Sequence, residues 1–208
     1  MIPKVHLLLQ GEHDHDRPCY VGMSMCIEPL TSSVTLIRGE SITLVDAGAP
    51  LYAEQLLNNL HRHGLEPEDV EYLLLTHLHL DHTQNSVLFK NAKIISEPNV
   101  QLVGLGRCEV FQKPITHPDW EIFSTNGHMP MHFSVFVDGV WQGGRRKIVV
   151  AGDAVRKDLI ISGYYRTPKA KAGERESALE IFNRAEVILP GHFEPIEGST
   201  LEEYRQML

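Results

Sequence analysis

The sequence has few cysteines and no long hydrophobic run. Its three cysteines, Cys19, Cys26 and Cys108, are odd in number and form no CxxC pair, which indicates a reducing compartment rather than a disulfide scaffold. No stretch reaches the roughly 18 apolar residues that a membrane span needs. The apolar run near the N-terminus is short and broken by charge, unlike a signal peptide. We therefore expect a soluble, cytoplasmic protein without a membrane partner.

Basic residues are also scarce. The 208 residues include 19 Lys and Arg against 27 Asp and Glu, a formal net charge of −8, with no basic block. This balance argues against an extended nucleic-acid-binding surface, although bound metal ions would add local positive charge. The length suits one substantial domain and is short for two, and no linker divides it, so we expect a single domain over 1–208. The expected partner is a small-molecule substrate, and a homo-oligomer is compatible with the sequence.

Strands and helices alternate along the chain. An amphipathic helix over 51–64 has leucines at helical spacing and ends at Gly64. The strands are grouped in each half with helices interleaved, which predicts two sheets packed face to face and covered by helices, a four-layer α/β arrangement. For 97–118 we expect a helix and a loop. The expected strands cover 4–10, 33–39, 41–48, 70–77, 92–96, 120–127, 132–139, 147–154 and 186–192, and further helices cover 80–89, 174–185 and 201–208.

Histidine, by contrast, is abundant, with 12 residues. Residues 73–85 read LLLTHLHLDHTQN, which places three histidines and an aspartate directly after an apolar strand. In an extended chain alternate residues share a face, so His77 and His79 point the same way. Asp81 and His82 are adjacent and diverge from the first pair if the chain bends there, so each pair can hold one metal ion. The alternative is a polar loop whose histidines cap a strand or face solvent.

A site for two metals needs further ligands at strand ends, where loops on a rigid scaffold carry chemistry. His128 follows a strand and a turn in FSTNGHMPMH, Asp153 ends the apolar strand of VVAGDAV, and His192 ends that of VILPGH. An ionised carboxylate at the position of Asp153 needs a partner or a metal. Each residue alone is more often a capping or surface residue, but the three together with HxHxDH favour a metal centre.

The order of motifs along the chain resembles that of the metallo-β-lactamase superfamily: THLHLDH, then GH, GD and PGH. The segment LVDAG at 44–48 resembles the aspartate–glycine element that precedes these motifs in the family. The resemblance covers residues 33–195 and implies an αββα sandwich that holds two metal ions. It assigns His77, His79 and His128 to the first ion, Asp81, His82 and His192 to the second, and Asp153 to both.

The resemblance also implies supporting roles. Asp46 would fix the ligand loops without touching a metal, a role that can matter greatly to affinity. We assign Asp81 and Asp153 to catalysis, because a bridging carboxylate such as Asp153 would hold the ions together and keep the nucleophile in place. Imidazole and carboxylate ligands suit zinc, and also iron or manganese, so two divalent ions are expected, with zinc as the default.

The chain departs from the family pattern around the ligands. Gln84 and Phe193 stand where relatives commonly carry glycine, and TNGHMPMH replaces TPGHTPGH. These changes alter loop conformations and pocket walls. His132 lies four residues after His128, so in an extended chain both would face the same side, and His132 could replace His128 as a ligand. Otherwise we expect His132 to support the ligands without touching a metal.

The expected chemistry is metal-assisted hydrolysis. Two metal ions can bind a bridging water, lower its pKa to give hydroxide near neutral pH, and polarise the substrate's oxygen. Asp153 argues against β-lactam cleavage, since zinc β-lactamases usually lack an aspartate at the bridging position. The absence of histidine from 154–191 argues against RNA-processing nucleases, and the short tail after His192 argues against thioesterases of the glyoxalase II type. We therefore predict a hydrolase for an ester, thioester or lactone.

Three alternatives remain: a phosphodiesterase or nuclease of the same superfamily, an iron oxygenase of the persulfide-dioxygenase kind, and a non-catalytic metal-binding module.

Tyr164, Tyr165 and Arg166, in the loop after the GD motif, are candidate substrate contacts, with simple packing as the alternative. His13 and His15 in EHDHD could form another metal cluster, but we favour a solvated loop on the rim of the pocket.

Overall fold

A mixed β-sheet runs through the molecule in two halves. The computed structural model describes residues 1–13, 19–21, 24–26, 29–103 and 107–208. The first half contains, in spatial order, β11 (Arg107–Val110), β10 (Val100–Val103), β9 (Lys93–Glu97), β8 (Tyr72–Leu74), β7 (Ile42–Val45), β6 (Val34–Arg38) and β1 (Lys4–Leu9). The second half contains β14 (Phe133–Trp141), β15 (Gly144–Gly152), β16 (Val187–Pro190) and β17 (Ile196–Glu197), with β13 (Trp120–Ser124) on the other edge of β14 and β12 (Thr116–His117) beyond it.

The two halves are joined by a single parallel register pair between β1 and β14, Lys4 with Val140. Because one pair holds them, each half can twist separately and the two can pack face to face. Among the described residues, two short antiparallel pairs lie outside this sheet: β2 (Glu12–His13) with β5 (Leu30–Thr31), and β3 (Cys19–Val21) with β4 (Ser24–Cys26).

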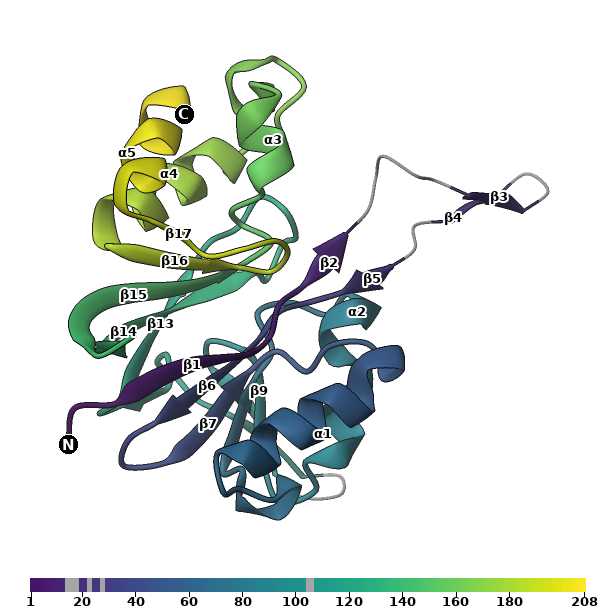
Figure 1. The fold of residues 1–208 in the computed structure, drawn as a ribbon, viewed down its shortest axis with the longest axis vertical. Helices are drawn as coiled ribbons and strands as arrows, with labels where there is room; N and C mark the ends of the chain where they lie inside the picture. Colours follow the sequence, from purple (N-terminus) through teal and green to yellow (C-terminus); the bar gives the residue numbers. More distant parts are fainter. Residues whose placement is uncertain (14–18, 22–23, 27–28, 104–106) are drawn as a thin grey trace.

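Helices cover the two outer faces (Figure 1). Helix α1 (Ala53–Arg62) lies on the first half, and α3 (Lys157–Ile161), α4 (Glu174–Arg184) and α5 (Gly198–Met207) lie on the second. Helix α2 (Leu80–Thr83) and the 3-10 turns η1 (Pro50–Tyr52), η2 (Pro67–Asp69), η3 (Gln84–Leu88) and η4 (Tyr164–Arg166) lie in the connections. None of the helices in the described ranges is long and apolar enough to cross a membrane.

In the part of the chain that the structure describes, the buried apolar side chains form three clusters, one at each interface between four layers. Successive residues of a strand face opposite sides, so Leu73 joins the cluster under α1 and Leu74 joins the cluster between the two halves. In β16, Val187 likewise faces the centre and Ile188 faces α4 and α5. Three cores between four layers confirm the predicted αββα architecture.

The predicted elements agree with the structure except in one region. Helix α1 ends just before Gly64, whose φ of 71° is the left-handed conformation that a helix-terminating glycine adopts. The helix expected within 97–118 is wrong: the chain there forms β10, β11 and β12. Strands β10 and β11 extend the edge of the first half, with most of their residues partly or fully exposed. Their local sequence lacks the strong apolar alternation of a half-buried strand, so pairing with β9 decides their conformation.

Candidate metal centre

The strand ends deliver the predicted site residues to one edge of the sandwich. After β8 the chain bends at Thr76 and His77, is extended at His79, the N-cap of α2, and becomes helical at Leu80. This change of direction separates His77 and His79 from Asp81 and His82, as the sequence predicts. Asp153 directly follows β15. His192 follows β16 by two residues, and His128 lies in the connection from β13 to β14.

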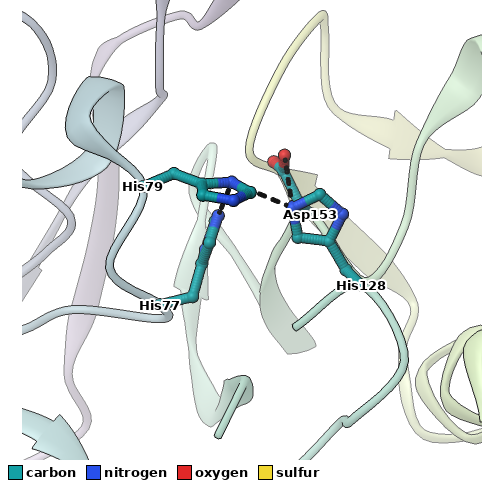
Figure 2. A group of neighbouring side chains, drawn as sticks. All are labelled: His77, His79, His128 and Asp153. Atoms are coloured by element: carbon teal, nitrogen blue, oxygen red, sulfur yellow. Dashed lines mark hydrogen bonds and ion pairs between the residues drawn. The ribbon is translucent and has the colours of Figure 1, made fainter. Parts of the chain in front are cut away.

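The first ligand group consists of His77, His79, His128 and Asp153. In Figure 2, His77 and His79 come from one segment and meet His128 and Asp153, which come from two others. The Nδ1 atom of His79 lies 3.0 Å from Nε2 of His77 and 3.1 Å from Nε2 of His128. Oδ2 of Asp153 lies 3.4 Å from Nε2 of His128. The group thus presents three ring nitrogens and one carboxylate oxygen to a common point.

The second ligand group consists of Asp81, His82 and His192. Oδ2 of Asp81 lies 3.5 Å from Nε2 of His82 and 3.4 Å from Nε2 of His192. Oδ1 of Asp153 lies 3.4 Å from each of the same two nitrogens. Asp153 therefore faces both groups, one oxygen toward each.

These spacings fit metal ions. Ligand atoms about 2.0–2.2 Å from a tetrahedral ion are about 3.3–3.6 Å apart, close to the 3.4–3.5 Å found in the second group. Among the described residues, Nε2 of His82 and Oδ1 of Asp153 are buried without a hydrogen-bond partner. Burying a polar atom without a partner costs about 1–3 kcal/mol of folding stability. A cation between these two atoms would bind both. The arrangement is suited to holding metal ions.

Asp46 and Thr76 set the ring orientation of two histidines. The Thr76 hydroxyl has one hydrogen, which it donates to Asp46 Oδ2 at 2.9 Å, so His77 Nδ1 must donate to Thr76 Oγ1 at 3.1 Å. His82 Nδ1 donates to Asp46 Oδ2 at 2.8 Å. We infer from this network that the Nε2 lone pairs of both rings face the centre, as in metal sites with carboxylate-supported histidines.

The same arrangement recurs at His192, whose Nδ1 donates to the carbonyl oxygen of Thr31 at 3.1 Å. Asp46 adopts a left-handed φ of 59°, a conformation that aspartate tolerates better than most residues. Its oxygens also accept a hydrogen bond from the Thr76 backbone nitrogen at 2.8 Å. The predicted role of Asp46, fixing the ligand loops by hydrogen bonds, matches these contacts.

Comparisons with known proteins agree with this geometry. A family model described as "Metallo-beta-lactamase superfamily" matches residues 27–105. Metallo-beta-lactamase domain-containing protein 1 of Xenopus laevis is 30% identical over 196 residues, 92% of this chain and 80% of that protein. The chain belongs to the metallo-β-lactamase superfamily. The human protein of the same name is 31% identical over 160 residues, and the alignment spans 58% of its length and 73% of this chain.

Other superfamily members carry a more specific description. An N-acyl homoserine lactonase of Bacillus thuringiensis is 30% identical over 99 residues, 41% of this chain and 40% of that protein. Among solved structures, a metallo-β-lactamase homologue of Thermotoga maritima has a TM-score of 0.69 at 20% identity, covering 95% of this chain and all of that one. An N-acyl homoserine lactone hydrolase with its product at the catalytic metal centre has a TM-score of 0.57 at 21% identity, covering 88% and 87%. At these identities the two structures support the superfamily fold alone.

The two ligand groups differ in their protonation. Burial lowers the pKa of His77 far below its usual value and that of His128 to about 4, so both rings are neutral near pH 7. Burial also opposes a charge on His82, but the carboxylates of Asp46 and Asp153 outweigh it and raise the pKa of His82 well above its usual value. Burial opposes the charge on Asp153 as well, yet the imidazoles of His192 and His82 hold its pKa well below the usual range. The carboxylate of Asp153 is thus ionised, and a cation that binds the Nε2 lone pair of His82 competes with a proton for it.

His132 lies behind the ligands and belongs to neither group. Ser134 donates its only hydroxyl hydrogen to the carbonyl of Ala151 at 3.0 Å, so Thr125 donates to Ser134 at 2.8 Å and His132 Nδ1 donates to Thr125 at 2.9 Å. The His132 ring centroid is 5.0 Å from that of His77. The structure therefore brings His128 to the ligand atoms and uses His132 to pack against one of them.

The three candidate substrate contacts in η4 make contacts within the fold. Tyr165 is buried, and its hydroxyl accepts a hydrogen bond from the Arg156 backbone nitrogen at 3.3 Å. Tyr164 donates to the carbonyl of Lys169 at 2.9 Å, and the Arg166 guanidinium donates to the carbonyl of Gln206 in α5. These contacts correspond to the packing alternative, and a role in substrate binding stays a prediction.

Sequence reasoning missed several supporting residues. Thr76 and Thr31 were given no role, although Thr76 directly precedes His77 and could have been considered on that ground. His13 was expected in a solvated loop on the rim of the pocket, and the loop is wrong: His13 is a half-buried residue of strand β2, with its ring edge-on to His192 at a centroid distance of 4.8 Å. His15 lies outside the described residues.

Proposed function

We propose that this protein is a metal-dependent hydrolase that cleaves an ester, thioester or lactone with two divalent metal ions, with zinc as the expected metal. The observation that carries the proposal is the position of Asp153. Its two oxygens lie 3.4 Å from ring nitrogens of different ligand groups, Oδ1 facing His82 and His192 and Oδ2 facing His128. A carboxylate placed in this way can be shared by two ions.

When bound, two divalent cations in such a site lower the pKa of water and polarise the oxygen of the substrate. The chain itself contributes fixed lone pairs, since Thr76, Asp46 and Thr31 hold the Nδ1 protons of three ligand rings away from the centre. Asp81 is 13% exposed, against 5% for Asp153. Asp81 therefore sits at the solvent side of the site, where its carboxylate can exchange a proton with the reacting groups.

The choice of a carbonyl substrate rests on relatives. The Bacillus thuringiensis protein is named for its action on an N-acyl homoserine lactone, and a lactone is opened by attack at a carbonyl carbon. Ester and thioester cleavage use the same kind of attack. A small-molecule substrate and a cytoplasmic location are part of the same proposal.

The test combines metal analysis with a substrate screen. The metal content of the protein as purified is measured by mass spectrometry. A second sample is loaded with zinc, passed through a desalting column and analysed in the same way, and hydrolysis of generic esters, thioesters, lactones and phosphodiesters is followed with both samples. Two zinc ions per chain with carbonyl hydrolysis would support the proposal. Turnover of phosphodiesters alone would favour a nuclease. One iron per chain together with oxygen consumption would favour an oxygenase, and bound metal without turnover would favour a metal-binding module.

A further inference from the structure

A cavity of about 460 Å³ adjoins the second ligand group. It lies between β2, α3 and the segment that follows His192. His13 and Phe193 both line it. The ring of His13 contacts that of His192 at a centroid distance of 4.8 Å, and Phe193 directly follows His192 in the sequence. A molecule that occupies this cavity would therefore lie beside the candidate metal centre.

The acidic side chains and the lysine that line the cavity already have partners. Lys157 is paired with Glu194, and Glu12 accepts a hydrogen bond of 2.7 Å from the hydroxyl of Tyr52. Asp158 accepts one of 2.7 Å from the guanidinium of Arg156. Lys157–Glu194 and Arg156–Asp158 are ion pairs, whereas Glu12 keeps its charge because the hydroxyl of Tyr52 is neutral. Beside these polar groups the lining has apolar members.

Those apolar members are Phe193, Ile161 and Pro29. Ile161, the last residue of α3, lines the cavity and is 56% exposed although it is a large aliphatic residue. Phe193 is half-buried and belongs to none of the three core clusters formed by the described residues. Neither side chain is needed to fill the interior, so their apolar surface is available to a ligand.

The backbone of Phe193 is strained. Its φ is 73°, in the left-handed region that glycine adopts freely and that bulky residues rarely occupy. The conformation is held by a hydrogen bond of 2.9 Å from its backbone nitrogen to the carbonyl of Gly11. A phenylalanine here costs conformational energy that burial in the core does not offset, and strain of this kind is commonly found at functional sites.

We propose that Phe193 and Ile161 form a subsite that binds the apolar acyl chain of the substrate and determines the preference for chain length. This inference rests on the proposed hydrolase function and narrows its substrates to esters, thioesters or lactones with an aliphatic acyl group. Each methylene group that the subsite removes from water raises kcat/KM about fourfold, until the cavity is filled.

The test uses the Phe193→Gly variant, because glycine fits the left-handed backbone and its substitution relieves strain rather than disrupting the fold. p-Nitrophenyl esters from acetate to octanoate share one leaving group and differ only in acyl length. In the unmodified protein kcat/KM should rise along the series through a falling KM. In Phe193→Gly the ratio of kcat/KM for the octanoate ester to that for the acetate ester should fall at least tenfold, while the thermal midpoint of unfolding stays the same or rises.

Two further variants accompany this test. Ile161→Ala should lower the same ratio. Val110→Ala changes an exposed residue of the outer strand β11 and should leave the series unchanged.

A binding measurement separates this inference from the proposed function. Calorimetric titration of the metal-loaded protein with alkanoates from acetate to octanoate should show affinity rising with length, and Phe193→Gly should flatten that rise. If no ester is cleaved but the alkanoate series behaves as expected, the hydrolase proposal fails and the subsite stands. If the protein cleaves esters but Phe193→Gly retains the original dependence on chain length in both series, the subsite is overturned.

Discussion

Replacing Asp153 with asparagine tests the shared carboxylate, because the amide has nearly the same shape and lacks only the charge. Asp153 is 5% exposed and its oxygens lie 3.4 Å from three ring nitrogens of the two groups. With an effective dielectric constant of about 20, a unit negative charge 3.4 Å from a dication contributes about 10 kcal/mol of gross attraction. An ion held between those nitrogens would lie at least as close.

Desolvation cancels most of this gross attraction, and the net loss is correspondingly smaller. We expect Asp153→Asn to weaken binding of at least one metal ion by a factor of 100 or more, about 2.7 kcal/mol, and to abolish nearly all hydrolysis. The assay is equilibrium dialysis against buffered zinc, with metal content and turnover measured on the same sample.

Two matched Asp→Asn changes serve as controls. Asp46→Asn removes the carboxylate that holds His82 and Thr76, and should reduce metal affinity about 10–100-fold, less than Asp153→Asn. Asp138→Asn, in an exposed pair with Arg145, should change neither quantity. Two tightly bound ions and full turnover in Asp153→Asn would refute the bridging role and the two-metal proposal with it.

Three further predictions follow from the same geometry. His128→Ala should lose the first metal and nearly all activity, whereas His132→Ala should keep most of the metal because its ring lies outside both ligand groups; the reverse result would mean that the ligand was misassigned. As the pH falls from 8 to 5, the second metal should be released first, because protons compete for His82, whose pKa is raised, while His128 stays neutral down to about 4; dialysis at a series of pH values measures the order of loss. Chelation should abolish hydrolysis and added zinc or manganese should restore it, whereas activity that persists after complete removal of metal would exclude metal-assisted hydrolysis.

The convergence of the candidate ligands could be predicted from the sequence because most of them are marked locally, and the family resemblance supplied the rest. His77 and His79 are alternate residues shortly after an apolar strand, and Asp153 and His192 follow apolar strands whose ends are recognisable from hydrophobic runs. These features need only the two-residue period of a strand and the change to α2 at Leu80.

The supporting contacts could not be predicted in the same way. His192 donates to Thr31, 161 residues away in the sequence, and His82 donates to Asp46, 36 residues away. Such pairs depend on how β5, β7 and β16 are brought together by the whole fold. The strands β10 and β11 were missed for a related reason, since their partner β9 supplies the pairing that their own sequence does not specify.

The most direct measurement is a crystal structure of the zinc-loaded protein with anomalous scattering recorded at the zinc edge. The proposal predicts two peaks, one among His77, His79 and His128 and the other among Asp81, His82 and His192, with Asp153 contacting both. A single peak, or two peaks of which only one contacts Asp153, would contradict it.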